Sequence, residues 1–249
     1  MSLLDLKGVE VQFSGFRALR GLDLSVSAGE LRCLIGPNGA GKTTALDVIC
    51  GRARASGGDI LFDGRSIRRF EEHRIARLGI GRKFQVPSVF RELTVRENLH
   101  VARSRRTGVF ANLGVRAAGG GADDLEKLAE FVGLKESFRR EAGTLSHGQT
   151  QWLEIAMLVA QDAQLILLDE PTAGMTTGET RKTAELCKRL KGRHTLIVVE
   201  HDMGFIKEIG DVISVMHQGR LLAEGTVAEI ENDPEVRDAY LGSGGISGA

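Results

Sequence analysis

A glycine-rich segment at residues 36–43, Gly-Pro-Asn-Gly-Ala-Gly-Lys-Thr, has the residue types and the spacing that bind a polyphosphate. In this pattern backbone N–H groups surround the phosphate oxygens, and glycines permit the close approach because they carry no Cβ. Lys42 would contact the β- and γ-phosphates, and the Thr43 hydroxyl would ligate Mg²⁺. The segment predicts a nucleotide site made by Gly36, Pro37, Asn38, Gly39, Ala40, Gly41, Lys42, Thr43 and Thr44.

The residues on either side of this loop predict the elements that must position it. The apolar run 30–35 is typical of a buried strand, and residues 43–50 are typical of a helix. The amino-terminal end of such a helix is positively polarised and would face the phosphates. Strand, loop and helix in this order favour nucleotide binding over a chance match of the glycine pattern.

Two further strands end in polar residues that suit phosphate chemistry. The apolar run 164–169 ends in Asp169 and Glu170, and the run 195–199 is followed closely by His201. Beside a phosphate-binding loop, Asp169 is placed to hold Mg²⁺ and Glu170 to polarise an attacking water. His201 would reach the γ-phosphate. Alone, each strand end would be no more than a solvated polar terminus.

The composition limits the other possibilities. Lysine plus arginine equals aspartate plus glutamate at 33 each, so no overall field attracts nucleic acid. Cys33, Cys50 and Cys187 lack metal-ligand spacing and indicate reduced thiols of a cytosolic protein. Charged residues interrupt the first apolar stretch, which is therefore not expected to be a signal peptide, and no apolar run reaches membrane-spanning length.

The remaining elements predict one α/β domain over residues 1–249. Strands over 3–13 and 22–26 would form an antiparallel part beside a mostly parallel sheet covered by helices. Helical patterns at 94–102 and 123–132, joined by a loop over 104–121, predict a helical insertion. We expect the α/β core over 1–85 and 154–240, the helical subdomain over 86–153, and a flexible tail over 241–249.

The pentapeptide Leu-Ser-His-Gly-Gln at residues 145–149, which is followed by an apolar helix over 151–160, is the discriminating motif. It resembles the signature segment of the ATP-binding cassette (ABC) family, commonly Leu-Ser-Gly-Gly-Gln. The resemblance covers essentially the whole chain, because five elements follow in family order. They are Gly36–Thr43, Gln85 after a strand, Leu145–Gln149, the strand ending in Asp169-Glu170-Pro171-Thr172, and His201.

The resemblance implies a P-loop NTPase core of the ABC type with an antiparallel β subdomain and an inserted helical subdomain. It also implies an ATPase whose two copies, or two unlike cassettes, pack head to tail around ATP. Ser146, Gly148 and Gln149 would then contact the γ-phosphate bound by the partner. A helix that begins at this segment agrees with that arrangement, since a helix N-terminus attracts anions.

The resemblance also implies a role for each matched residue. Lys42 would bind phosphate, Thr43 and Asp169 would hold Mg²⁺, and Gln85 would contact both Mg²⁺ and the attacking water. The catalytic set would be completed by Glu170 as the base and His201 as the γ-phosphate sensor. Phe13 is favoured as the platform for the adenine ring, although Phe13 and Phe16 could equally belong to the core.

Two positions depart from the family pattern. His147 replaces the usual second glycine of the pentapeptide and adds an imidazole near a phosphate site. Thr176 stands where many cassettes have an aspartate that communicates between the two sites. The second departure raises the question of whether both sites are equivalent, and it is consistent with a heterodimer of unlike cassettes.

Four stretches narrow the group within the family. Residues 90–99 and 236–242 resemble importers for branched-chain amino acids, whereas 81–90 and 170–176 resemble the urea-transporter ATP-binding subunit. The resemblance therefore implies import of urea, with branched-chain amino acids as the alternative. It places the chain at the inner face of the cell membrane, held by two transmembrane permease subunits and served by a solute-binding protein. In such transporters the segment beginning at Gln85 couples to the permeases, and Val86, Val89, Phe90 and Leu93 are candidate contacts or core residues.

Other classes of protein explain less of the sequence. A soluble ABC ATPase of an assembly complex stays open. A P-loop kinase or GTPase would leave the segment 145–149 and His201 unexplained, and a nucleotide-binding regulator without turnover is disfavoured because Glu170 is present.

Overall fold

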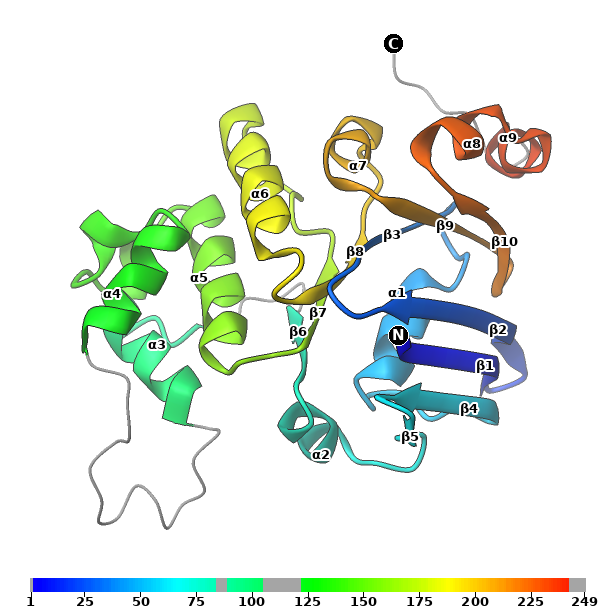
Figure 1. Ribbon diagram of the computed structural model, residues 1–249, viewed down its shortest axis with the longest axis horizontal. Helices are drawn as coiled ribbons and strands as arrows, with labels where there is room; N and C mark the ends of the chain where they lie inside the picture. Colours follow the sequence, from blue (N-terminus) through cyan, green and yellow to red (C-terminus); the bar gives the residue numbers. More distant parts are fainter. Residues whose placement is uncertain (1, 84–88, 105–121, 242–249) are drawn as a thin grey trace.

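The computed structural model describes residues 2–83, 89–104 and 122–241. Within these ranges two sheets and a group of helices lie side by side along an elongated molecule (Figure 1). Four expected features fall outside the described residues: Gln85, Val86, most of the expected 104–121 loop, and the tail beyond Leu241.

The larger sheet has the strand order β10-β9-β3-β8-β7-β6 in the described part of the chain. Its neighbours pair in parallel except for the antiparallel edge hairpin of β9 and β10. This confirms the mostly parallel sheet expected from continuous apolar strands. The strands are β3 (Leu31–Ile35), β6 (Ile80–Lys83), β7 (Leu165–Asp169), β8 (Thr195–Val199), β9 (Val212–His217) and β10 (Arg220–Gly225).

Both faces of this sheet are covered, which explains why its central strands β3, β7 and β8 are buried along their whole length and mostly apolar. On β8, Leu196 and Val198 belong to the core shared with the helices, whereas Ile197 and Val199 belong to the core shared with the second sheet. Successive side chains of a strand point to opposite faces, so a strand covered on both sides needs no polar alternation.

The smaller sheet is antiparallel and has the order β2-β1-β4-β5. Helix α1 (Lys42–Ile49) packs between the two sheets, and its Ala45, Leu46 and Ile49 are fully buried there (Figure 1). The strands are β1 (Ser2–Phe13), β2 (Phe16–Ser27), β4 (Gly57–Phe62) and β5 (Arg65–Ser66). The second strand begins six residues earlier than the sequence pattern predicts, because a register shift places two buried residues, Ala18 and Leu19, in succession and interrupts the alternation.

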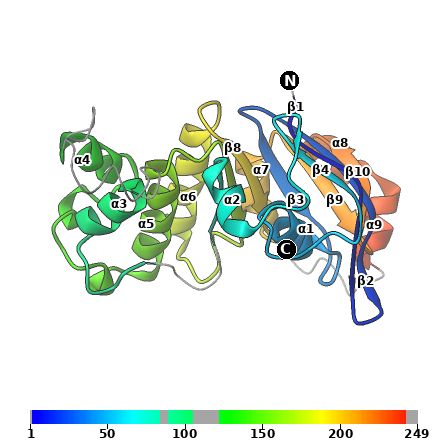
Figure 2. The ribbon, with the colours of Figure 1, turned by 90° about the horizontal axis from the view of Figure 1, so that it is seen from below.

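The helices α3 (Val95–Ser104), α4 (Ala122–Phe131) and α5 (His147–Ala160) pack together at one end of the molecule, away from the antiparallel sheet (Figures 1 and 2). The expected border between residues 153 and 154 falls inside α5, which is continuous across it. Short 3-10 turns η1 (Lys135–Ser137) and η2 (Ala142–Thr144) lead into this helix.

The other helices cover the sheet and its edges. Two of them, α7 and α9, were not predicted, because each is short and begins at an aspartate in a polar segment. No helix of the described ranges is long and apolar enough to cross a membrane. The helices are α2 (Glu72–Arg77), α6 (Thr177–Leu190), α7 (Met203–Ile209), α8 (Val227–Asn232) and α9 (Pro234–Leu241).

Candidate nucleotide-binding and catalytic site

Three polar segments meet at one edge of the larger sheet. The glycine-rich loop follows β3, Asp169 ends β7, and Glu200 follows β8. Because these three strands are adjacent and parallel, their carboxyl ends lie at the same edge. Ligands of open parallel sheets bind at this edge.

The glycine-rich loop is enclosed by backbone on its outer side. A Cβ at Gly36 would lie 2.1 Å from the Met216 carbonyl oxygen, and a Cβ at Gly41 would lie 2.8 Å from the Ala18 carbonyl oxygen. Both glycines have positive φ, 147° and 102°. The Gly219 N–H, in the turn between β9 and β10, donates to the Ala40 carbonyl over 2.9 Å. The loop therefore requires glycine for conformation and for space.

Lys42 lies in the concave side of this loop. Its Nζ donates to the carbonyl oxygens of Gly36, at 2.7 Å, and Pro37, at 3.1 Å. The residue is 6% exposed, and burial lowers the pKa of the ammonium group, while the charges of Glu170 and Asp169 raise it. In the described part of the chain this ammonium is held by carbonyl oxygens alone, so it is available to a phosphate that enters the loop.

Asp169 is buried, and one of its two carboxylate oxygens has a hydrogen-bond partner among the described residues. Its Oδ2 accepts from Arg82 Nη2 over 2.9 Å, and the same guanidinium contacts Asp47 Oδ1 on α1 at 2.5 Å. Among the described residues its Oδ1 has no hydrogen-bond partner and is inaccessible. Buried carboxylate oxygens normally have partners. This carboxylate oxygen could therefore bind Mg²⁺ directly, or accept a hydrogen bond from a water on Mg²⁺, near the start of α1 at Lys42 and Thr43.

Glu170 and His201 face each other, with 3.2 Å between Glu170 Oε1 and His201 Nε2. Both side chains are partly exposed, at 36% and 43%. The backbone of Glu170 has a φ of 46°, and its N–H donates to the Val199 carbonyl over 2.9 Å. A left-handed non-glycine residue costs free energy and is held here by the neighbouring strand. The arrangement offers a carboxylate base and an imidazole to one reacting group.

Glu200 links the two segments, which the sequence reading did not recognise. Its Oε1 accepts from the backbone N–H of Thr172, at 2.9 Å, and from the Thr172 hydroxyl, at 2.5 Å. Its Oε2 accepts from the N–H of His201 over 3.0 Å. The residue is 4% exposed. An acid directly after the apolar run Leu196–Val199 was the available signal.

The signature segment, residues 145–149, begins α5 as a capping box. Ser146 Oγ accepts from the Gln149 N–H at 3.2 Å, and Gln149 Oε1 accepts from the Ser146 N–H at 3.0 Å. A Cβ at Gly148 would lie 2.4 Å from Glu179 Oε1. The segment lies on the helical side of the molecule, apart from α1 and the glycine-rich loop (Figures 1 and 2). One chain therefore does not bring its own loop and signature segment together.

The other predicted residues are placed as follows. Phe13 and Phe16 are paired across the β1–β2 turn and are 49% and 60% exposed, so neither is a core residue. Thr176 caps α6 and forms a capping box with Glu179. Gln85 lies outside the described residues.

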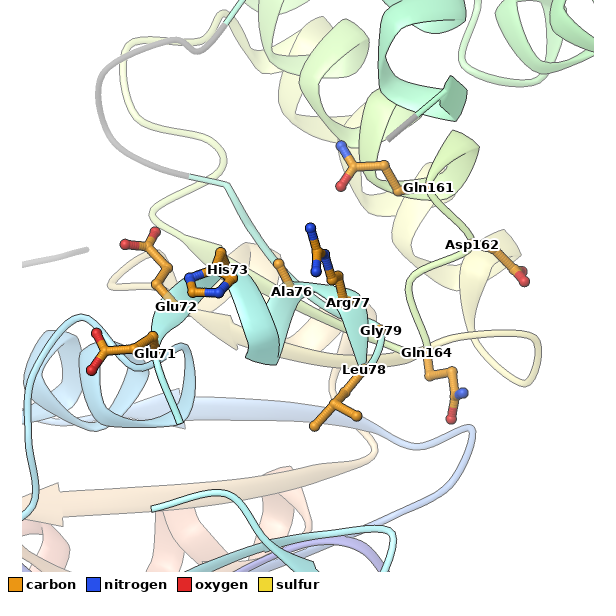
Figure 3. Close-up of a pocket in the computed structure, with 10 residues that line it drawn as sticks. All are labelled: Glu71, Glu72, His73, Ala76, Arg77, Leu78, Gly79, Gln161, Asp162 and Gln164. Atoms are coloured by element: carbon orange, nitrogen blue, oxygen red, sulfur yellow. The ribbon is translucent and has the colours of Figure 1, made fainter. Parts of the chain in front are cut away.

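A cleft of about 950 Å³ opens between α2 and the end of α5 (Figure 3). Arg77 of α2 and Gln161, directly after α5, extend into the same space (Figure 3). A neighbouring hollow of about 340 Å³ shares Ala76 and Gln161 with it and is lined by Phe90, which is 48% exposed. The cleft therefore separates the helical part from the α/β core.

These features define a P-loop nucleoside triphosphatase: a parallel sheet, a glycine-rich loop with a buried lysine, and carboxylates at the end of β7. Residues 19–173 match the family model described as ABC transporter, and residues 220–246 match the model described as branched-chain amino acid ATP-binding cassette transporter. The chain belongs to the ABC transporter family of ATP-binding cassettes, and it is an ATPase that binds ATP.

Its relatives cover nearly the whole chain. It is 38% identical to the high-affinity branched-chain amino acid transport ATP-binding protein LivG of Escherichia coli, over 96% of this chain and 98% of that protein. It is also 38% identical to BraF of Pseudomonas aeruginosa, another protein of that description, with the same coverage. The ADP conformation of an ATP-binding cassette of an ABC transporter superposes with a TM-score of 0.84 at 30% identity, covering 97% of this chain and 99% of that one. The chain thus falls in the branched-chain amino-acid group of importer ATPases.

Proposed function

We propose that this chain is the ATPase subunit that powers import of branched-chain amino acids, through permease subunits at the inner face of the cell membrane. The observation that carries the proposal is the similarity to LivG, which covers 96% of this chain, and the family-model match at 220–246 agrees with it. The urea interpretation rests on residues 81–90 and 170–176 alone, and the relatives favour the amino-acid alternative.

In the proposed ATPase reaction Lys42 and the backbone of the glycine-rich loop bind the phosphates. Thr43 and Asp169 are the residues that fit Mg²⁺, which would supply neutralisation of phosphate charge when bound. Glu170 takes a proton from the attacking water, and His201, 3.2 Å away, orients that carboxylate and contacts the γ-phosphate. The buried Glu200 holds the backbones of both segments in place. Gln85, which lies outside the described residues, remains proposed to contact Mg²⁺ and the attacking water.

The site of one chain is incomplete, and we propose that a second cassette completes it. The signature segment lies away from the chain's own phosphate loop (Figure 1). The capped start of α5 presents Ser146, Gly148 and Gln149 to a phosphate held by a partner. Phe13, exposed at the rim of the antiparallel sheet, is available for an adenine ring. ATP would thus hold two cassettes, like or unlike, head to tail.

The cleft between α2 and α5 is the proposed permease contact (Figure 3). The neighbouring hollow is lined by Lys83, the last described position before Gln85, and by the exposed Phe90. Among the described candidates Val89 and Leu93 are half-buried, with Val89 packed against the helical core, whereas Phe90 is exposed. An exposed apolar side chain beside this cleft suits a helix end inserted from the permease.

Capture of a trapped complex tests the proposal. Tagged Glu170→Gln, incubated with Mg-ATP and detergent-solubilised membranes of its native host, should retain two multi-spanning proteins and a second cassette. The same chain carrying Lys42→Ala as well should lose the cassette partner. The co-encoded or co-purified solute-binding protein is then titrated with leucine and with urea. Leucine binding supports the proposal, whereas urea binding would make urea the transported solute in place of branched-chain amino acids. Recovery of soluble partners alone would overturn the transporter assignment.

A further inference from the structure

His147, the first residue of α5, contacts the loop at residues 170–176 of the same chain. Its Nε2 lies 3.0 Å from the Ala173 carbonyl oxygen. A carbonyl oxygen only accepts, so this contact requires the hydrogen on Nε2. The ring lies against Gly174, where φ is +73° and a Cβ would be 3.5 Å from Nε2. The residue that departs from the common pentapeptide is therefore a direct bridge between two functional segments.

The neighbouring residues reinforce this bridge at its far end. Ser146 Oγ donates to Glu179 Oε1 over 3.3 Å, while Glu179 Oε2 accepts from the N–H and hydroxyl of Thr176, at 3.0 and 2.9 Å. Gln151 is buried one turn into α5, with 3.2 Å between its Nε2 and His147 Nε2. Both nitrogens are donors when His147 donates to Ala173, so this contact adds no hydrogen bond. The signature segment is thus joined to residues 173–179 at two places, through Ser146 and through His147.

The bridged carbonyl belongs to the turn that carries Glu170. The Ala173 N–H donates to the Glu170 carbonyl over 3.2 Å, and the Met175 N–H donates to the Thr172 carbonyl over 3.0 Å. The Thr172–Ala173 peptide is therefore held at both ends, since its C=O accepts from Met175 and its N–H donates to Glu170. A displacement of the Ala173 peptide therefore changes the orientation of Glu170, whose backbone is already in the left-handed region.

We propose that His147 is a positioning residue that connects the signature segment to the loop bearing Glu170, so that a partner's nucleotide bound at the signature segment orients this chain's own carboxylate. This inference rests on the head-to-tail dimer of the proposed function. A glycine at position 147 has no side chain to reach Ala173. The imidazole of His147 supplies this link. In this chain the aspartate that many cassettes have at position 176 is replaced by a threonine, which caps α6.

Three variants of the full-length chain separate the link from general stability. His147→Gln places an amide N–H near the position of Nε2, His147→Ala removes the donor, and His100→Ala removes an exposed histidine of α3 as the control. Hydrogen exchange is followed without nucleotide, so the measurement needs no turnover. His147→Ala should accelerate exchange at Ala173 and Met175 roughly three- to tenfold, as expected for the loss of one hydrogen bond. The strand amides of β8 should not change, and His147→Gln should restore protection.

Turnover and dimerisation then test the functional part. At saturating Mg-ATP, kcat of His147→Ala should fall roughly three- to tenfold with KM unchanged, and His147→Gln should stay within about twofold of the parent. In the Glu170→Gln background, His147→Ala should dimerise with ATP as the parent does. Unchanged exchange, equal loss in both His147 variants, or loss of ATP-driven dimerisation would each overturn the positioning role. Absence of dimerisation in Glu170→Gln itself would instead contradict the proposed function.

Discussion

The carboxylate of Glu200 binds the backbone N–H of Thr172 at 2.9 Å and its hydroxyl at 2.5 Å, although the two residues lie at the ends of different strands. Its second oxygen binds the N–H of His201. Because Thr172 follows Glu170 by two residues, one buried acid fixes the approach of the proposed base and of its imidazole partner. A buried charge with three donors is satisfied, and removal of its charge leaves those donors short of an acceptor.

Glu200→Gln should therefore lower both stability and turnover. An amide offers one acceptor oxygen, so its NH₂ group must face either Thr172 or His201. We expect a loss of about 1–3 kcal/mol in the free energy of unfolding, measured with urea, and a fall in kcat larger than the change in KM. Glu185→Gln, an exposed carboxylate of α6, is the matched control. Parent-like kcat in Glu200→Gln would show that the bridge does not position the reacting groups.

Glu170→Gln should bind ATP, dimerise more persistently and turn over poorly, since the amide keeps the shape of the side chain but cannot accept a proton. The rate should fall by about 100-fold or more, in the range of general-base contributions. Steady-state phosphate release measures the rate, and size-exclusion chromatography with Mg-ATP measures the dimer. Normal turnover would remove Glu170 from the role of base.

Lys42→Ala should lose ATP affinity by about tenfold or more, because the ammonium now held by the Gly36 and Pro37 carbonyls is the group free to meet a phosphate. Equilibrium titration with a fluorescent ATP analogue measures the change. Lys188→Ala, at an exposed position of α6, should bind like the parent. Equal affinity of Lys42→Ala and the parent would contradict the assignment of the phosphate loop.

Gly148→Ala should destabilise the chain, whereas Gly178→Ala should not. A Cβ at 148 meets Glu179 Oε1 at 2.4 Å, and that carboxylate is committed to Thr176 and Ser146. At Gly178, inside α6, an added Cβ finds no described atom within 4 Å. Overpacking costs about 1–3 kcal/mol, and alanine in a helix gains up to about 1 kcal/mol over glycine. Thermal unfolding of the pair should therefore shift in opposite directions.

Cys33 and Cys187 should make the protein less stable at high pH. Burial raises the pKa of each thiol from 9.0 to about 12. The folded state thus favours the thiol, and its contribution to stability is present below pH 9 and is lost as the pH rises towards 12. Cys187→Ala should reduce this pH dependence in urea unfolding. An unchanged slope between pH 9 and 11 would show that the thiols are not the cause.

The local patterns predicted most elements, because apolar periodicity and punctuating glycines act over a few residues. The loop at Gly36–Thr43 and the strands ending at Asp169 and Val199 lie where the sequence placed them. The division into core and helical subdomain stays a prediction, and α5 runs through its second border. The short helices α7 and α9 were missed, since too few residues carry their pattern.

The sequence by itself determined the ABC family, the ATPase chemistry and the residues placed at the strand ends, because motif spacing is a property of the chain. Only the tertiary structure decided which of them touch. The Glu200–Thr172 bond spans 28 residues and the His147–Ala173 contact spans 26, and each depends on how neighbouring elements pack. A hydrogen bond requires a donor and an acceptor within about 3 Å, and no periodicity encodes that distance between separate elements.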